Sequence, residues 1–188
     1  MYEDLEVRRI VNANARLTAL GGSKMPDAVL AAMNEASGSY VDMHELQRAV
    51  GRRIAELTRN EGAYVATGAA AGIVVSTLAT MNRGDLPTIA RALEGETPPR
   101  HEVVIHRAHR IPYDPAVKLA GARLIEIGNA LQTFPWELEA AIGPATAAVL
   151  FVAGDHLAHG ALSLAETVAI AHERGVPVIV DAAAQLPP

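Results

Sequence analysis

The sequence predicts an α/β fold in which a mostly parallel, doubly wound sheet is flanked by helices. Five short β-prone runs alternate with segments of helical periodicity along the 188 residues. Half of the residues are apolar, which is enough to form a buried core. In such a sheet, right-handed crossovers bring the carboxyl ends of the strands to one edge, where ligands bind.

Residues 1–62 are predicted to form an N-terminal helical segment. Pro26 opens a helix over 27–37, and an amphipathic helix is expected over 43–58. The second helix begins with a capping-box pattern, because Asp42 is followed three residues later by Glu45. Apolar residues then recur at helical spacing, so one face of this helix can be buried.

Residues 63–188 are predicted to form the domain that contains the sheet. Strands are expected at 63–67, 102–106, 122–127, 147–152 and 176–180. Helices are expected after Gly72 and at 115–120, 134–142 and 164–174. The stretch 81–100 is rich in Gly, Pro and charge and is interpreted as a connecting excursion.

The turn after the first strand, TGAAAG at 67–72, is typical of an anion cradle. At a helix start the first backbone N–H groups have no partner within the helix, and the helix dipole places partial positive charge there. A phosphate can then be held without a basic side chain. An Ala-rich helix whose glycines only permit tight packing would give the same pattern.

Polar residues follow two other strands. His and Arg side chains at 106–110 come directly after the strand 102–106, where a site or a hydrated basic loop is expected. Asp181 follows the apolar run 176–180. An aspartate in this place either caps the next turn or pairs with a cation.

Composition limits the other possibilities. The net charge is −5 with no long basic run, which argues against nucleic-acid and membrane surfaces. The absence of Cys excludes disulfides and thiolate metal sites, and the pair His156 and His159 has no third ligand, so no metal site is expected. No apolar run reaches the length of a membrane span, and acidic residues follow Met1, so a cytoplasmic location is expected.

The motifs taken together resemble the large, aminotransferase-like domain of fold-type I pyridoxal-phosphate enzymes. The motifs are TGAAAG at 67–72, RAHR at 107–110 and VPVIVDAAAQLPP at 176–188. The closest resemblance is to the branch that contains selenocysteine synthase and D-glucosaminate-6-phosphate ammonia-lyase. LGGSKM at 20–25, YVDMHELQ at 40–47 and the stretch 160–185 fit this branch as well.

The resemblance implies pyridoxal 5'-phosphate as cofactor and assigns residues to it. Backbone and small side chains of Gly68, Ala69 and Ala70 would hold the cofactor phosphate. His109 would lie over the pyridine ring, and Asp181 would pair with the protonated ring nitrogen. His109 and Asp181 are therefore the expected catalytic residues.

Two further roles and one departure follow from the resemblance. Gln185 would reach the ring hydroxyl, and Arg110 would bind a substrate carboxylate or phosphate. Family members form a Schiff base with a lysine beyond the Asp strand, whereas the lysines here, Lys24 and Lys118, lie in other settings. The sequence therefore looks like an N-terminal fragment: a partial large domain without its C-terminal remainder and without the small domain.

Two functions remain open at this point, and a nucleotide-binding α/β domain is a weaker third interpretation, because the cradle lacks both the G-x-G-x-x-G pattern and a Walker lysine. The first is the N-terminal part of a pyridoxal-phosphate lyase or transferase that catalyses β-elimination or replacement on an amino acid or amino sugar. The second is a truncated, non-catalytic remnant, or half of a split enzyme, that pairs with another chain. The expected partners are a small-molecule amino substrate and either a second copy of the chain or a complementing C-terminal half, with no nucleic acid and no membrane.

Overall fold

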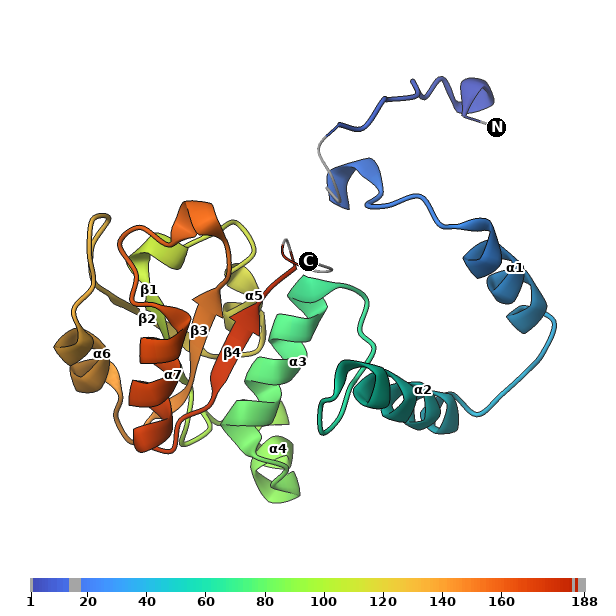
Figure 1. Ribbon diagram of the computed structural model, residues 1–188. Helices are drawn as coiled ribbons and strands as arrows, with labels where there is room; N and C mark the ends of the chain where they lie inside the picture. The colour runs from blue at the N-terminus through green and yellow to red at the C-terminus, as the bar shows by residue number, and fades with distance from the viewer. Residues whose placement is uncertain (1, 14–17, 184, 186–188) are drawn as a thin grey trace. The chain divides into compact units, whose positions relative to one another are not determined.

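The chain is organised as two units, which are described separately. The computed structural model describes residues 2–13, 18–183 and 185 (Figure 1). Contacts within the chain separate residues 1–65 from residues 66–188. The sequence placed this division after residue 62.

The first unit consists of helices. Its helices are the 3-10 turns Glu3–Leu5 and Thr18–Leu20, α1 (Asp27–Ala36) and α2 (Met43–Thr58). The predicted cap of α2 is confirmed, since Asp42 Oδ1 accepts a hydrogen bond of 2.8 Å from the backbone N–H of Glu45. This bond satisfies one of the N–H groups that a helix start leaves without a partner.

The residues that follow α2 pack back onto it. Gly51 of α2 is buried, and a Cβ at this position would lie 2.4 Å from the carbonyl oxygen of Ala63. The side-chain amide of Gln47 donates to the carbonyl of Val65 at 2.8 Å. The strand predicted at 63–67 is wrong, because these residues have no regular structure and no strand of the described residues pairs with them.

The second unit contains a parallel sheet of four strands. The strands are β1 (Glu102–His106), β2 (Arg123–Ile127), β3 (Thr146–Val152) and β4 (Val178–Asp181). Their order across the sheet is β2-β1-β3-β4, and every neighbouring pair is parallel. The predicted fold class is therefore confirmed, with four strands in place of the expected five.

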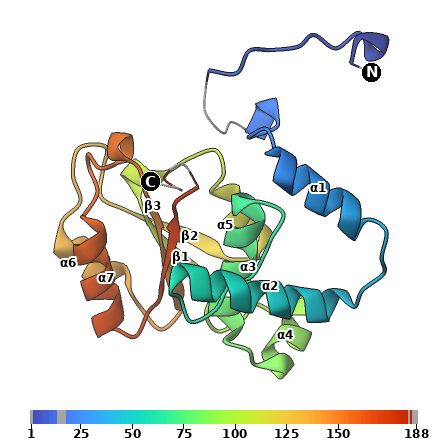
Figure 2. The ribbon, with the colours of Figure 1, turned by 45° about the vertical axis from the view of Figure 1, so that its right-hand side comes forward.

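Helices connect and cover these strands. They are α3 (Ala69–Asn82), α4 (Leu86–Leu93), α5 (Pro115–Leu119), α6 (Pro135–Ala141) and α7 (Leu164–Glu173), with 3-10 turns η3 (Arg107–His109) and η4 (Asp155–Leu157). Figure 2 shows α6 and α7 on one side of the sheet and α3 and α5 on the other. Helix α4 corrects the interpretation of 81–100 as a plain connection. Its start is capped by Asp85, whose carboxylate accepts from the N–H of Thr88 at 3.0 Å. None of the helices in the described residues is both long and apolar enough to cross a bilayer.

Two apolar clusters, one on each face of the sheet, form the core. On one face, Ile73 and Met81 of α3 and Val117 of α5 pack against β1 and β3. On the other face, Leu138 of α6 and Ala171 of α7 pack against the same strands. The unit is thus a three-layer α/β/α structure in which β1 and β3 are covered on both sides.

Candidate functional site

The carboxyl edge of the sheet gathers the residues that the sequence singled out. β1 leads directly into η3, which carries His109, and β4 ends at Asp181. Helix α3 packs against β3 and β4, and its amino end lies at this same edge (Figure 1). The predicted phosphate cradle, His109 and Asp181 are therefore brought to one side of the second unit.

The amino end of α3 offers free backbone donors. Gly68 is the N-cap residue, has φ of +123°, and provides no side-chain cap. The first backbone bond returning to the cap runs from the N–H of Gly72 to the carbonyl of Gly68, at 3.0 Å. Ala69 and Ala70 are exposed, and a Cβ added at Gly68 would meet no atom within 4 Å. An anion can approach this helix start closely.

His109 is buried behind this edge. Its ring is 1% exposed and lies edge-on to Phe151 of β3, with 4.4 Å between the ring centroids. The backbone N–H of Val152 donates to Nδ1 at 3.4 Å. Burial lowers the pKa of His109, and a backbone hydrogen bond with Leu157 opposes this shift. The role over a cofactor ring stays a prediction, since no face of the imidazole is open to solvent.

The sequence did not predict that His106 is completely buried. The last residue of β1, it is 0% exposed, and its ring centroid lies 5.0 Å from that of His109. Neither ring nitrogen has a hydrogen-bond partner among the described residues. Burial, with a smaller contribution from His109, lowers the pKa of His106 to about 4, so the ring is neutral at physiological pH. The one sign of this burial in the sequence is that His106 directly follows the apolar residues Val103–Ile105.

Asp181 does cap the turn that follows β4. Its Oδ1 accepts from the N–H of Ala183 at 3.1 Å, and its backbone carbonyl accepts from the N–H of Ala153 at 2.8 Å. The other carboxylate oxygen accepts no hydrogen bond from the described residues, so it is available to a cation. Gln185 lies in an exposed turn, where its N–H donates to the carbonyl of Ala182 at 2.9 Å; its role at a ring hydroxyl stays a prediction.

Arg110 is held by two carboxylates. Its guanidinium forms ion pairs with Asp114 and with Glu126 of β2. The hydrogen bond to Asp114 is the main cause that raises the pKa of Arg110. A substrate carboxylate or phosphate would have to compete with these partners, so the predicted substrate-binding role stays a prediction.

The two lysines lie outside the predicted site segments. Lys118 is exposed in the last turn of α5, and Lys24 is exposed in the first unit. His156 and His159 are exposed in the loop around η4. Within the described ranges, no group of three or more His, Cys, Asp or Glu residues is placed to hold a metal ion.

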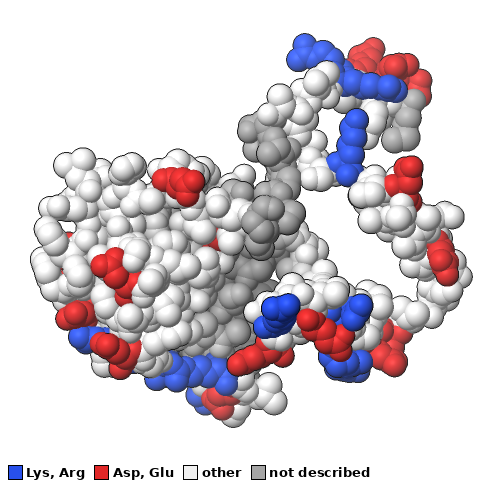
Figure 3. Space-filling view, in the orientation of Figure 1, with Lys and Arg blue, Asp and Glu red and all other residues white. Residues whose placement is uncertain are grey.

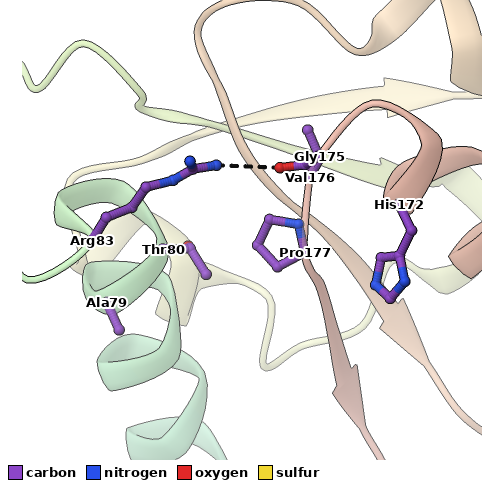
Figure 4. Close-up of a pocket in the computed structure, with 7 residues that line it drawn as sticks. All are labelled: Ala79, Thr80, Arg83, His172, Gly175, Val176 and Pro177. Atoms are coloured by element: carbon purple, nitrogen blue, oxygen red, sulfur yellow. Dashed lines mark hydrogen bonds between the residues drawn. The ribbon is translucent and has the colours of Figure 1, made fainter.

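A shallow groove lies elsewhere, where α3 ends and β4 begins (Figure 4). It encloses about 540 Å³ and is lined by Ala79, Thr80, Arg83, His172, Gly175, Val176 and Pro177. The Arg83 guanidinium reaches across it and donates to the carbonyl of Gly175 at 3.2 Å. The groove contains none of the predicted site residues, so the candidate site is placed at the carboxyl edge.

Comparison with known proteins identifies the family. The family model described as SelA, L-seryl-tRNA selenium transferase, matches residues 10–186. The chain belongs to the L-seryl-tRNA selenium transferase family. The predicted resemblance is thereby confirmed.

Several curated relatives cover almost the whole chain. D-glucosaminate-6-phosphate ammonia lyase of Salmonella typhimurium is 32% identical over 98% of this chain and 51% of its own length. 5'-C-glycyluridine monooxygenase-decarboxylase of a Streptomyces species is 37% identical over 98% of this chain and 48% of its own length. L-seryl-tRNA(Sec) selenium transferase of Geotalea uraniireducens is 31% identical over 94% of this chain and 39% of its own length. The chain spans about half the length of the first two and less of the third.

Solved structures agree with this family and with the fold. The structure of D-glucosaminate-6-phosphate ammonia-lyase, at 32% identity, superposes on 98% of this chain and 51% of its own with a TM-score of 0.90. An aspartate aminotransferase from Thermotoga maritima, at 17% identity, covers 96% of this chain and 48% of its own with a TM-score of 0.56. The second likeness shows the fold alone.

Proposed function

We propose that this chain carries the cofactor-binding part of a pyridoxal-phosphate-dependent lyase or transferase that acts on an amino acid or amino sugar. The observation that carries the proposal is the layout of the carboxyl edge. The uncapped amino end of α3 lies at the same edge as Asp181, one of whose carboxylate oxygens accepts no hydrogen bond from the described residues. Membership of the L-seryl-tRNA selenium transferase family supports the same assignment.

The residues at this edge suit the chemical groups of pyridoxal phosphate. Backbone N–H groups at Gly68, Ala69 and Ala70 would hold the phosphate without a basic side chain. The Asp181 oxygen that accepts no hydrogen bond from the described residues would hold the proton on the ring nitrogen. His109 is buried, so it would contact the ring only once the residues that cover it move. When bound, the cofactor supplies an electron sink for a carbanion beside the substrate amine.

A small-molecule substrate fits this chain better than tRNA. The relatives include enzymes named for D-glucosaminate 6-phosphate and for L-seryl-tRNA(Sec). The net charge is −5, whereas a nucleic-acid surface needs clustered Lys and Arg. On the described part of the face seen in Figure 3, basic and acidic side chains are interspersed and form no basic stripe. The proposal includes a cytoplasmic location, which the lack of Cys permits.

Titration with pyridoxal phosphate tests the proposal. Since neither Lys24 nor Lys118 follows the Asp181 strand, where the family's Schiff-base lysine is expected, we expect binding without a covalent link. Cofactor fluorescence should report saturable binding, and borohydride reduction followed by mass spectrometry should find no lysine adduct. An adduct on Lys118 would show that the cofactor binds elsewhere, and a failure to bind at all would refute the proposal.

A matched pair of variants locates the binding site. Asp181→Asn keeps an oxygen that can accept from the N–H of Ala183, but it removes the charge. We expect its affinity for pyridoxal phosphate to fall by about tenfold, the equivalent of one charge-assisted hydrogen bond. Glu173→Gln, which removes an exposed carboxylate at the end of α7, is the control and should bind as the unmodified chain does.

Pairing with another chain is a second candidate function, favoured by the open edge of β4. The opposite edge strand, β2, carries Arg123 and Glu126, which discourage pairing with a further strand. β4 has no charge before Asp181, and Val180 is 41% exposed. A second copy of the chain or a complementing C-terminal half would cover this edge. Light scattering on the unmodified chain and on Val180→Lys tests this, and identical monomeric masses would refute self-pairing.

A further inference from the structure

Three aromatic rings meet where β1 ends and η3 begins. His106 and His109 contact each other edge-on, with ring centroids 5.0 Å apart and an interplanar angle of 62°. Phe151 of β3 lies 4.4 Å from His109 at 78° and 6.1 Å from His106 at 81°. All three rings are buried. His109 is thus held by rings on two sides, both of them in edge-to-face contacts that proteins favour.

Packing alone does not explain a histidine at position 106. The preceding residues of β1, Val103, Val104 and Ile105, are apolar and fully buried, so the position lies in a core environment. Both ring nitrogens of His106 lack hydrogen-bond partners among the described residues, which costs stability. A phenylalanine would make the same edge contact without this loss. What the imidazole adds is a basic, dipolar ring beside His109.

The surroundings of His109 select one neutral form of its ring. The N–H of Val152 donates to Nδ1 at 3.4 Å, so Nδ1 is an acceptor and the ring hydrogen belongs on Nε2. His106 is a titratable side chain whose ring contacts that of His109. The reverse influence is the smaller one on His106, because a charge on His109 would add to the burial that already disfavours protonation of His106.

We propose that His106 is a positioning residue that, together with Phe151, holds the His109 ring in one orientation and one neutral tautomer at the edge of the candidate cofactor site. His106 acts through His109 and contacts no ligand itself. The inference rests on the proposed function only in taking His109 as the ring that faces the cofactor. The effect on His109 can be observed without any cofactor.

Nitrogen-15 NMR of the histidine rings is the decisive experiment. The chain is labelled at histidine and titrated between about pH 5 and pH 8, the range in which free imidazole changes charge. His106→Phe keeps an aromatic ring at the contact, whereas His106→Ala removes it. His172→Phe changes an exposed histidine at the end of α7 and serves as the control. The signal of His109 is assigned from its loss in His109→Gln.

The expected spectra differ between the variants. In the unmodified chain and in the control, Nδ1 of His109 should give the signal of an unprotonated acceptor down to low pH. In His106→Phe the tautomer and the pKa of His109 should both persist, because His106 is already neutral over this range and phenylalanine keeps the ring contact. In His106→Ala a mixture of tautomers is expected. Identical His109 signals in the unmodified chain and in folded His106→Ala would overturn the inference.

Cofactor binding provides a second readout. The affinity for pyridoxal phosphate, measured by fluorescence, should fall by roughly three- to tenfold in His106→Ala, the equivalent of one lost aromatic contact. The loss should be smaller in His106→Phe. If the unmodified chain does not bind pyridoxal phosphate, the proposed function fails while the NMR result still decides the role of His106. Binding that is equal in all variants would overturn that role even if the proposed function holds.

Discussion

Acid should destabilise the second unit through His106 before its carboxylates are protonated. The folded chain lowers the pKa of this ring from 6.5 to about 4. The unfolded chain therefore binds more protons between these two values, and the free energy of unfolding falls as the pH drops through this window. At about 1.4 kcal/mol per pKa unit, the full loss is roughly 3 kcal/mol, of which about 2 kcal/mol has occurred by pH 5.

The variant His106→Phe isolates this effect. This variant keeps a ring against His109 but cannot be protonated at position 106. Between pH 7.5 and pH 5 its free energy of unfolding should therefore fall by about 2 kcal/mol less than that of the unmodified chain. At neutral pH it should be at least as stable as the unmodified chain, because it leaves no buried nitrogen without a partner. Other titrating groups contribute to both proteins and largely cancel in the difference.

Urea unfolding followed by far-ultraviolet circular dichroism at several pH values gives the required free energies. Trp136 is exposed and would be a poor fluorescence probe of the core. Parallel stability profiles for the two proteins from pH 7.5 to pH 5 would show that His106 does not cause the loss of stability in acid. They would mean that His106 is charged in the folded chain or that water reaches it.

Two further substitutions probe close contacts. Gly51→Ala should destabilise the first unit by about 1–3 kcal/mol, because its Cβ would press on the carbonyl of Ala63; loss of hydrogen-exchange protection over α2 is the measurement. Gly72→Ala, at a helical glycine with open space, is its control and should be neutral or stabilising. Arg110→Ala should cost about 1–3 kcal/mol in urea unfolding, because the buried carboxylate of Asp114 loses its cation; unchanged stability would show that Arg110 is free for substrate.

The sequence predicted correctly a helix that is stabilised by interactions between residues close together in the chain. Helix α2 begins at Met43 and ends at Thr58 as expected, because its cap at Asp42 and its apolar spacing act within a few residues. Helix α4 was missed although the same kind of cap, Asp85 with Thr88, begins it. The Gly and Pro residues around it favoured a loop, so the capping pattern at Asp85 was not recognised.

Interactions between distant residues could not be predicted from the sequence. The run 63–67 has strand composition, but a strand also needs a neighbour with which to form hydrogen bonds, and composition does not supply one. Arg110 and Asp114 are only four residues apart and pair across the turn that leads into α5, whereas Glu126 reaches Arg110 because β2 pairs with β1. The burial of His106 likewise depends on β3, which supplies Phe151.

The sheet explains why the candidate site forms where it does. β3 is buried along its whole length, so unpaired polar groups along it would be costly. Free polar groups are tolerated where the strands end, as at Asp181. β1 begins at the amino edge of the sheet, and α3 and α4 precede it in the chain. Because α3 runs toward that amino edge, its own amino end lies beside the carboxyl ends of the strands (Figure 1). Topology alone thus places the free donors of Gly68–Ala70 and the carboxylate of Asp181 at one edge, and ring contacts such as that of His106 then set orientation within it.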